Sequence, residues 1–343
     1  MTAGNEKVES PLVTVLLSVY NGERFLRESV ESILGQTFTD FEFLIVDDAS
    51  TDSTAQILTE YASRDRRIRL VRNPANVGLT RSLNRGLALA AGKYVARQDA
   101  DDVSLPERLQ RQVEFFAGNP GTALLGGGLE LIGERGETLG RRLPPTDHQS
   151  LIAELLIKNN AIGHSCAMLA LSAVRELGGY DESFPYAQDY DLWWRISRRW
   201  KIANLPEVLV RWRSTGTSIS SSRRQEQLSC MYRTSVAAVS ETIGPGLLDN
   251  QAYCRFWHAY HGEVEGLRQG DLQCLKPLWD YISTLNGDME ATREGMKNLY
   301  YGLLRCGNRA EACELRRVIV DSFHGDISFW KAVKNRLRGL IGA

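Results

Sequence analysis

Three carboxylates fall within four positions of the chain, at Asp99, Asp101 and Asp102, directly after an apolar run and just before Pro106. Like charges this close disfavour joint ionisation, so the group costs stability unless a cation or several hydrogen-bond donors compensate it. Two carboxylates one residue apart at the end of a strand can bind Mg²⁺ or Mn²⁺, whose coordination shell is then completed by substrate phosphates. The alternative is a solvated turn that caps the helix opening at Pro106, because Asp and Ser favour such positions.

A fourth acidic residue, Asp48, follows another apolar run. Acidic residues at this place bind a ribose or a base in nucleotide-binding sheets, although Asp48 could equally cap the helix that follows "DDASTDST". The segment after the first apolar run, "SVYNGERFL", contains a single glycine and lacks the G-x-G-x-x-G pattern. That pattern cradles the pyrophosphate of a dinucleotide, so a nicotinamide-dependent enzyme is disfavoured.

Short apolar runs that predict strands alternate with amphipathic runs that predict helices. The predicted strands cover residues 12–20, 41–48, 68–73 and 93–99, and the predicted helices cover 23–35, 53–63 and 79–91. Such alternation predicts a parallel sheet with helices on both faces, whose ligands lie beyond the carboxyl ends of the strands. The polar residues expected to share that edge are Ser18, Tyr20, Asp47, Asp48, Asn73, Asn76, Asp99 and Asp101.

Beyond Pro120 the pattern becomes mixed. "TALLGGGLELIG" and "HSCAMLA" predict strands, residues 150–158 predict a helix, and another helix begins near Asp189. From about Ser221 onward the strand signals stop and helical periodicity takes over. We therefore expect an α/β domain over residues 8–220 and a mostly α-helical region over residues 221–343.

Composition narrows the class of protein. The 343 residues are 43% hydrophobic and 24% charged, which is ordinary for a globular protein, and 41 Lys and Arg balance 42 Asp and Glu. No global field would draw such a chain onto nucleic acid. The start lacks the basic segment of a signal peptide, and no run reaches the roughly 18 apolar residues of a membrane span. The six cysteines lack C-x-x-C spacing, so we expect reduced thiols and a cytoplasmic protein.

Several motifs occur in the order typical of one enzyme family. They lie in "VTVLLSVYNGERFLRESVESILGQTFTDFEFLIVDDASTDST" and in "NPANVGLTRSLNRGLALAAGKYVARQDADDVSLPERL". On these motifs the chain resembles family 2 glycosyltransferases, which use nucleotide sugars and have the GT-A fold, a Rossmann-like mixed sheet with flanking helices. The resemblance covers residues 13–220 and includes several motifs rather than one.

The resemblance implies a role for each matching residue of the donor site. Asp48 matches the acidic residue that hydrogen-bonds the uracil or other base, and Asp101 matches the ligand of a divalent metal ion, Mn²⁺ or Mg²⁺. Asp99 matches the residue that faces the ribose or the donor sugar. The other residues matched to the nucleotide site are Ser18, Tyr20, Asn76, Gly78, Arg81 and Asn84.

The same resemblance places the acceptor side in three later segments. In "YAQDYDLWWRI", Asp189 matches the catalytic base, with helix capping as its alternative, while Gln188 stands where the family usually has Glu. In "GHSCAML", His164 is a candidate contact for the acceptor or a phosphate, although a His before a buried strand is also an ordinary core residue. In "LVRWRSTGTSIS", Arg213 matches a residue that closes over the diphosphate, and Thr215 replaces the usual His.

These residues imply an inverting glycosyltransferase that moves one sugar, from a UDP-sugar as the expected donor, to a hydroxyl of a saccharide or lipid-linked saccharide acceptor. The family suggests the assembly of a bacterial surface polysaccharide. The segment "ISRRW" has Ile196 where processive polymerases carry Gln, which favours transfer of a single sugar. Two alternatives are a sugar-nucleotide-binding protein without catalysis and a nucleotidyltransferase. The latter would need a glycine-rich loop with Lys or Arg after the first strand.

The last predicted helix, residues 328–342, combines an apolar stripe with the cations Lys331, Lys334, Arg336 and Arg338. A basic amphipathic helix of this kind can lie in the interface of an anionic membrane. Packing against its own domain is the alternative. Lipid binding by this helix would bring the enzyme to the inner face of the cytoplasmic membrane.

Overall fold

The computed structural model describes most of the chain, in two compact units. The described residues are 10–157, 161–216, 223–247, 249–261, 266–268, 270–285, 296, 298–303 and 309–322. One unit comprises Met1–Thr146 and Ile162–Cys230, and the other comprises Asp147–Ala161 and Met231–Ala343. The predicted terminal helix over residues 328–342 lies outside the described residues.

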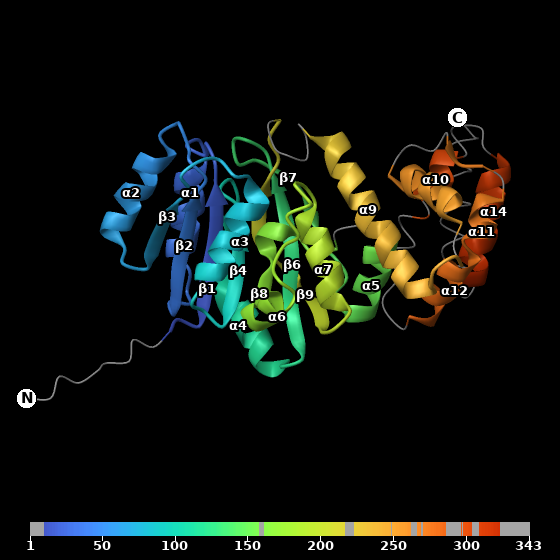
Figure 1. Cartoon of the computed structure of the whole chain (residues 1–343), viewed down its shortest axis with the longest axis horizontal. Coiled ribbons are helices and arrows are strands. Elements are labelled where there is room, and N and C mark those ends of the chain that lie inside the picture. Colours follow the sequence, from blue (N-terminus) through green and yellow to red (C-terminus); the bar gives the residue numbers. More distant parts are fainter. Residues whose placement is uncertain are drawn as a thin grey trace, which may run out of the picture. The chain divides into compact units, whose positions relative to one another are not determined.

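The first unit is built on a single sheet. Within the described residues, nine strands pair in the order β3-β2-β1-β4-β8-β6-β9-β5, and β7 pairs with β6 (Figure 1). The strands are β1 (Val13–Val19), β2 (Phe41–Asp47), β3 (Ile68–Arg72), β4 (Tyr94–Gln98), β5 (Val103–Ser104), β6 (Thr122–Ile132), β7 (Thr138–Arg142), β8 (Met168–Ala170) and β9 (Lys201–Arg213). β1 to β4 are parallel, and β8 is antiparallel to both β4 and β6. The predicted mixed α/β fold is confirmed.

One predicted strand is wrong over its first half. The segment "HSCAMLA" begins with a short 3₁₀ helix, η1 (His164–Cys166), and only its last three residues pair as β8. The backbone N–H of Ala167 donates to the His164 carbonyl at 3.2 Å, which closes a turn that an extended strand does not contain. The apolar composition of the segment reflects burial, which a 3₁₀ turn and a strand share.

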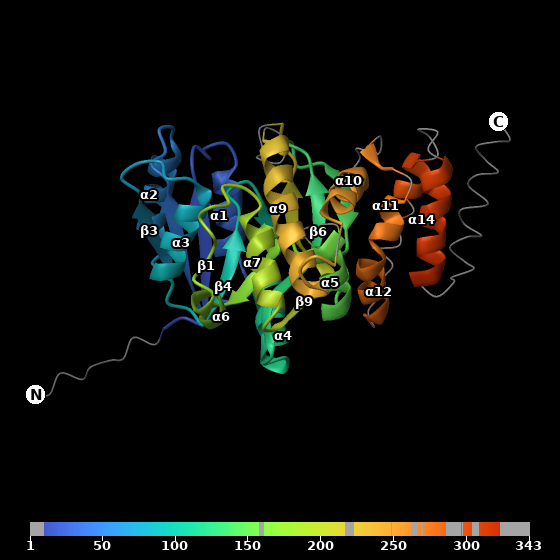
Figure 2. The ribbon, with the colours of Figure 1, turned by 45° about the vertical axis from the view of Figure 1, so that its right-hand side comes forward.

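The two faces of the sheet are covered because its strands are apolar on both sides, as parallel strands require. Helices α1 (Leu26–Leu34), α2 (Thr54–Arg64) and α4 (Arg108–Gly118) pack against the face that carries Val15, Leu17 and Phe43. Leu16 faces the opposite side and abuts Gly86 of α3 (Leu79–Leu89). Figure 2 shows α6 (Leu171–Glu176) and α7 (Gln188–Ser197) on the same side as α3.

The carboxyl ends of three neighbouring strands coincide. Across β1 and β2 the register aligns Val19 with Asp47. Across β1 and β4 it aligns Leu17 with Gln98. The residues that follow these three strands therefore lie along one edge of the sheet, where α/β proteins bind their ligands.

Gly92, which leads into β4, has no room for a side chain, and we expect Gly92→Ala to destabilise the fold. A Cβ there would lie 2.4 Å from the Thr14 backbone nitrogen and 2.7 Å from the Val13 carbonyl carbon. Because these are backbone atoms of the neighbouring strand, relief requires the strand to shift, and the free energy of unfolding should fall by about 1–3 kcal/mol. Urea denaturation measures the loss. The control is Gly118→Ala, where a Cβ would meet no atom within 4 Å beyond its own helix and chain neighbours; an equal loss in both variants would contradict the explanation.

The second unit is helical. Its helices are α5 (His148–Ile157), α10 (Asn250–Tyr260), α11 (Asp271–Cys274), α12 (Lys276–Thr284) and α14 (Arg309–Ser322), and α9 (Arg224–Ile243) leads into it. Every side chain from Ser150 to Ile157 of α5 is buried, and the Leu156 carbonyl accepts hydrogen bonds from Ser235 and Tyr253. A helix this apolar needs cover on all sides. The sequence-based division at residue 220 places α5 in the first domain, whereas the structure assigns α5 to the second unit.

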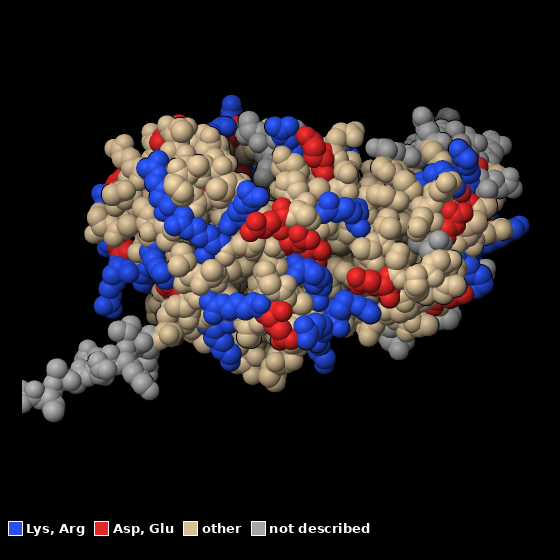
Figure 3. Space-filling view, in the orientation of Figure 1, with Lys and Arg blue, Asp and Glu red and all other residues tan. Residues whose placement is uncertain are grey.

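Among the described residues, no helix is long and apolar enough to cross a membrane. On the face of the chain shown in Figure 3, basic and acidic side chains are interspersed. This mixture accords with the net charge of −1.

Candidate functional site

The loops that follow β1 and β2 are held together by hydrogen bonds. The Asn21 side chain accepts from the Thr51 backbone N–H at 2.8 Å, and the Gly22 N–H donates to the Thr54 hydroxyl at 2.9 Å. Ser18 is buried beneath these loops, whereas Tyr20 is 49% exposed at the rim. Of the two residues predicted to line a nucleotide site, the structure thus leaves the Tyr20 ring open to a ligand.

Asp48 is buried and organises the loop before α3. One of its carboxylate oxygens accepts hydrogen bonds from the Asn73 amide at 2.6 Å and from the Val77 N–H at 3.0 Å. The other oxygen accepts one from the Gly78 N–H at 2.9 Å and keeps capacity for a further donor. The alternative in which Asp48 caps the helix after "DDASTDST" is not what the structure shows, because Asp52 accepts from the Thr54 N–H at the start of α2.

The residues predicted beside the nucleoside fall into two groups. Asn76 is exposed on the loop, and Gly78 has a φ of 89°, a conformation that favours glycine. Asn84 instead exchanges two hydrogen bonds of 2.9 Å with the backbone of Tyr180, and Arg81 forms an exposed ion pair with Glu182. The structure therefore gives Arg81 and Asn84 partners on the segment that leads to α7.

The turn after β4 carries the acidic cluster. Arg97, which is 1% exposed, donates to the Asp99 carboxylate at 2.6 Å, and the Ser29 hydroxyl donates to the Asp99 carbonyl at 2.8 Å. The Asp101 carboxylate accepts no hydrogen bond from any other described residue. Burial and then the charge of Asp99 raise the pKa of Asp101 to about 6.

These properties fit a divalent cation at Asp101. An oxygen ligand without a donor, kept from easy ionisation by burial and by a second carboxylate, is what a hard cation stabilises. No group of three or more His, Cys, Asp or Glu side chains that could hold a metal ion occurs in the described part of the chain. A cation held by this one carboxylate would need further oxygen ligands, such as phosphates, which Mg²⁺ sites commonly include.

The third carboxylate, Asp102, turns into the protein. It is buried, and one oxygen accepts the Arg213 backbone N–H at 2.8 Å. Burial and then the charge of Asp101 raise the pKa of Asp102 well above its usual range. Helix α4 begins only at Arg108, and the backbone N–H of Leu109 donates to Gln36. The helix-capping alternative for the acidic cluster is therefore wrong.

Helix α7 begins at Gln188, directly after Ala187 in the left-handed conformation. Gln188 and Asp189 are both buried, and the Asp189 carboxylate accepts the Tyr190 N–H at 2.9 Å. The charges of Asp189 and Asp99 both act on the Tyr180 hydroxyl, and burial is the main reason why the pKa of Tyr180 is raised. Asp189 and Asp99 therefore both lie within electrostatic range of the Tyr180 hydroxyl.

Asp191, the next carboxylate on α7, has a different environment. It pairs with Arg195 at 2.7 Å one helical turn away, and Arg195 also donates to the Gly179 carbonyl. Asp191 therefore supports the helix and the preceding loop.

His164 hydrogen-bonds Tyr180, with 3.0 Å between its Nε2 and the hydroxyl oxygen. Burial, and then the positive charge of Arg97, lower the pKa of His164 to about 3. The imidazole is therefore neutral at physiological pH and contributes no positive charge toward a phosphate. The contact with Tyr180 gives His164 a structural partner at the edge of the site.

The shifted pKa of His164 predicts a pH dependence of stability. Because the ordinary pKa is near 6.5 and the folded value is about 3, the unfolded state binds more protons between these values, and acidification destabilises the fold. The variant His164→Gln keeps a polar contact with Tyr180 and does not titrate. Relative to this variant, the wild type should lose stability from about pH 7 to about pH 4. Urea denaturation of both proteins across this range checks it, and a constant difference would refute the shift.

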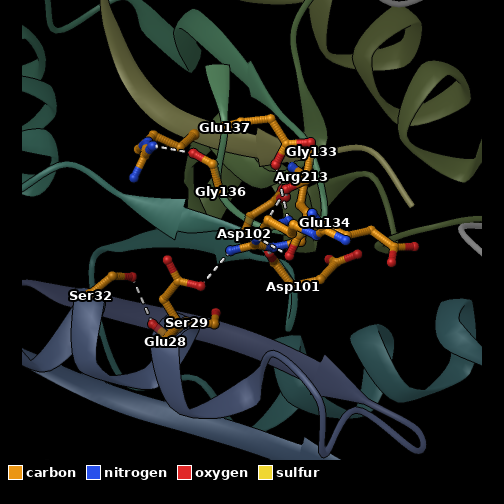
Figure 4. A network of polar contacts seen from close by, with 12 residues as sticks. Glu28, Ser29, Ser32, Asp101, Asp102, Gly133, Glu134, Gly136, Glu137 and Arg213 are labelled. Carbon is orange, nitrogen blue, oxygen red and sulfur yellow. Dashed lines mark hydrogen bonds and ion pairs between the residues drawn. The ribbon is translucent and has the colours of Figure 1, made fainter. Parts of the chain in front are cut away.

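Arg213, at the end of β9, is 2% exposed. Its guanidinium donates to the backbone carbonyls of Asp101, Gly133 and Glu134 (Figure 4). The N–H groups predicted to contact a diphosphate thus donate to backbone carbonyls of the protein in this structure.

Two residues of the site have no counterpart in the sequence-based prediction. Arg97 interrupts the apolar run of β4, and a charge inside a buried strand is the signal that could have pointed to it. Tyr180 contacts His164 and receives the electrostatic influence of both acidic segments. Nothing in the local sequence around Tyr180 marks it.

Polar and acidic residues beyond the carboxyl ends of neighbouring parallel strands, here Asp48 after β2 and the acidic turn after β4, lie where α/β proteins bind nucleotides. The model of glycosyl transferase family 2 matches residues 14–178. The amylovoran biosynthesis glycosyltransferase AmsE of Erwinia amylovora is 32% identical over 219 residues, which are 62% of this chain and 80% of AmsE. The chain belongs to glycosyltransferase family 2.

Two solved structures share the fold. TarS of S. aureus, residues 1–349 in complex with UDP-GlcNAc, has a TM-score of 0.55 at 18% identity and covers 91% of this chain and 92% of its own. The mannosyltransferase PcManGT of Pyrobaculum calidifontis, in complex with GDP-Man and Mn²⁺, has a TM-score of 0.55 at 17% identity and covers 92% of this chain and 88% of its own. The fold is therefore of the GT-A type.

Proposed function

We propose that this glycosyltransferase moves a single sugar from a nucleoside-diphosphate sugar to an acceptor hydroxyl, with inversion at the anomeric carbon. The observation that carries the proposal is the Asp101 carboxylate, which accepts no hydrogen bond from other described residues and lies beside Asp99 at the edge of the sheet. Asp189, like Asp99, lies within electrostatic range of the Tyr180 hydroxyl. A cation-binding carboxylate and a separate carboxylate base are the groups that such a transfer requires.

In this proposal the donor lies along the carboxyl edge of β1, β2 and β4. The free capacity of the buried Asp48 oxygen suits an N–H of the base, and the exposed Tyr20 and Asn76 lie on the loops around it. TarS was solved with UDP-GlcNAc and PcManGT with GDP-Man, so proteins of this fold bind nucleotides with either base. A UDP-sugar is the donor to test first.

Asp101 would hold Mn²⁺ or Mg²⁺ together with the donor diphosphate. When bound, the ion supplies charge neutralisation for the departing nucleoside diphosphate. The Mn²⁺ in the PcManGT complex supports this assignment. Asp99, oriented by Arg97, faces the ribose or donor sugar.

Asp189 acts as the base. The acceptor oxygen attacks the anomeric carbon as the bond from that carbon to the diphosphate oxygen breaks, and the hydroxyl proton passes to the Asp189 carboxylate. Asp189 lies in the first turn of α7. The Gln188 side chain is an amide and cannot accept this proton, so its proposed role is to bind the acceptor.

The acceptor in this proposal is a saccharide or a lipid-linked saccharide. The relative AmsE is named for amylovoran biosynthesis, which supports a setting in the assembly of a bacterial surface polysaccharide. Such an acceptor would be met at the inner face of the cytoplasmic membrane. The predicted basic amphipathic helix over residues 328–342 would bind anionic lipids there.

Incubation of the purified protein with Mn²⁺ and a panel of UDP- and GDP-sugars tests the proposed function. We expect slow hydrolysis of one donor, with release of its nucleoside diphosphate, and loss of this activity in EDTA. A protein that binds a nucleotide sugar and never breaks it down would be the non-catalytic alternative. Release of pyrophosphate from a nucleoside triphosphate and a sugar phosphate would indicate the nucleotidyltransferase.

A further inference from the structure

We propose that Arg213 is a positioning residue that fixes the Asp101 turn for the cation, and that it does not contact the donor diphosphate. This inference rests on the proposed function, because it concerns how that same site is built. The role it assigns to Arg213 differs from the one implied by the family resemblance. It also gives a structural role to Asp102, the third carboxylate of the turn, which is not needed to bind the cation or the donor.

The first argument is that four of the five N–H groups of the Arg213 guanidinium already have protein acceptors. Its Nε donates to the Asp101 carbonyl at 2.9 Å, and its Nη1 lies 3.2 Å from the Gly133 carbonyl and 3.3 Å from that of Glu134. Its Nη2 pairs with the Glu28 carboxylate of α1. The guanidinium also lies over the ring of Phe25, 4.5 Å from its centre. A diphosphate would have to displace these acceptors from a side chain that is almost wholly buried.

The second argument is that the main chain of Arg213 is attached to the same turn. Its N–H donates to the carboxylate of Asp102 at 2.8 Å. Just beyond, β5 pairs with β9, which aligns Val103 with Arg211. Arg213 therefore prolongs this pairing onto the turn itself, and Asp102 is the acceptor that makes the prolongation possible. Asp102 is the third carboxylate, and its role is to join β9 to the turn.

The other flank of the turn is held separately. Gln98 donates to the Asp102 carbonyl at 2.8 Å, and the Ser29 hydroxyl donates to the Asp99 carbonyl. Of the three carboxylates on this turn, that of Asp101 alone accepts no hydrogen bond from other described residues. The direction of its side chain is therefore set by the backbone of the turn. Figure 4 shows Arg213 between this turn, the loop at Gly133 and Glu134, and Glu28. Loosening Arg213 should therefore misplace Asp101.

A direct contact with the diphosphate and a positioning role predict different effects of metal. A direct contact stabilises a bound nucleoside diphosphate with or without Mn²⁺. A positioning role acts through Asp101, so it affects only the part of the affinity that Mn²⁺ adds. Removal of the Glu28 carboxylate distinguishes the two roles further. If Arg213 contacts the diphosphate, the change frees its guanidinium for a phosphate; if Arg213 positions Asp101, the change loosens the turn.

The experiment measures the Kd of UDP and of GDP by calorimetry, in MnCl₂ and in EDTA, for the full-length wild type, Arg213→Lys, Glu28→Gln and the double variant. We expect Arg213→Lys to reduce the gain in affinity from Mn²⁺ by roughly 10-fold, the size typical of residues that orient a metal ligand. Glu28→Gln should reduce it in the same direction by less, and the double variant should lose less than the sum. The Kd in EDTA should not change in any of them.

The matched control is Arg24→Gln, which breaks the exposed 2.6 Å ion pair with Glu134 on the same loop and leaves Arg213 intact. It should keep the full gain from Mn²⁺. A weaker Kd in EDTA for Arg213→Lys, or a stronger one for Glu28→Gln, would overturn the positioning role. An unchanged gain from Mn²⁺ in both variants would also overturn it. Should Arg213→Lys fail to fold, Glu28→Gln decides alone, because Glu28 is half exposed. A wild type that gains nothing from Mn²⁺ with either nucleotide would instead contradict the metal site of the proposed function.

Discussion

In the variant Asp189→Asn, kcat should fall by roughly 100-fold or more, which is the size of effect expected when a general base is removed. The change keeps the size of the side chain and an oxygen that can accept the Tyr190 N–H at the start of α7. It removes only the ability to take the proton of the acceptor hydroxyl. The Kd of the nucleoside diphosphate should stay near that of the wild type, because the acidic turn and Asp48 are untouched.

Steady-state kinetics at saturating donor, together with calorimetry for the nucleotide, check this prediction. The matched control is Asp191→Asn, two residues along the same helix, where the carboxylate pairs with Arg195. That change should lower the stability of the fold and leave kcat within a few-fold of the wild type. A wild-type kcat in Asp189→Asn, or a larger loss in Asp191→Asn, would move the base elsewhere.

The variant Asp101→Asn should lose most turnover and keep or gain stability when no metal is present. Its carboxylate has a pKa raised to about 6 by burial and by Asp99. A folded-state pKa above the ordinary value means that the ionised carboxylate destabilises the metal-free fold at neutral pH, so a neutral amide relieves this cost. Loss of activity with no loss of stability is typical of residues kept for function.

Thermal unfolding in EDTA and turnover in Mn²⁺ measure the two effects separately. Addition of Mn²⁺ should raise the Tm of the wild type in the presence of the nucleoside diphosphate, because a ligand that binds only the folded state stabilises it. Asp101→Asn should lose that increase. Turnover of the wild type that is indifferent to EDTA would show that no divalent ion takes part.

The parts of the fold that could be predicted from the sequence are those with local signals. The runs around Val13, Phe41 and Tyr94 are strands because their apolar residues suit a sheet buried on both faces. Their carboxyl ends then lie together by the geometry of parallel strands alone. The positions of Asp48 and Asp101 at one edge follow from that geometry.

The parts that were missed depend on partners far apart in the sequence. Asn84 holds the backbone at Tyr180, 96 residues away, and Arg213 pairs with Glu28, 185 residues away. The local sequence around Asn84 or Arg213 does not indicate which distant residue it contacts. The same holds for α5, whose apolar surface reveals burial without saying against which helices. Arg97 is the exception, because a charge within a buried strand is a local signal.

The most direct test of the account is proton NMR of the sugar that appears in the first turnovers, before mutarotation, with Mg²⁺ as the diamagnetic cation. With an α-linked nucleotide sugar, the account predicts a β-configured product and one nucleoside diphosphate released for each sugar transferred. It also predicts that the sugar product and the released nucleoside diphosphate both nearly vanish in Asp189→Asn. A product that retains the α configuration, or one that forms equally fast without the Asp189 carboxylate, would contradict direct displacement at this site.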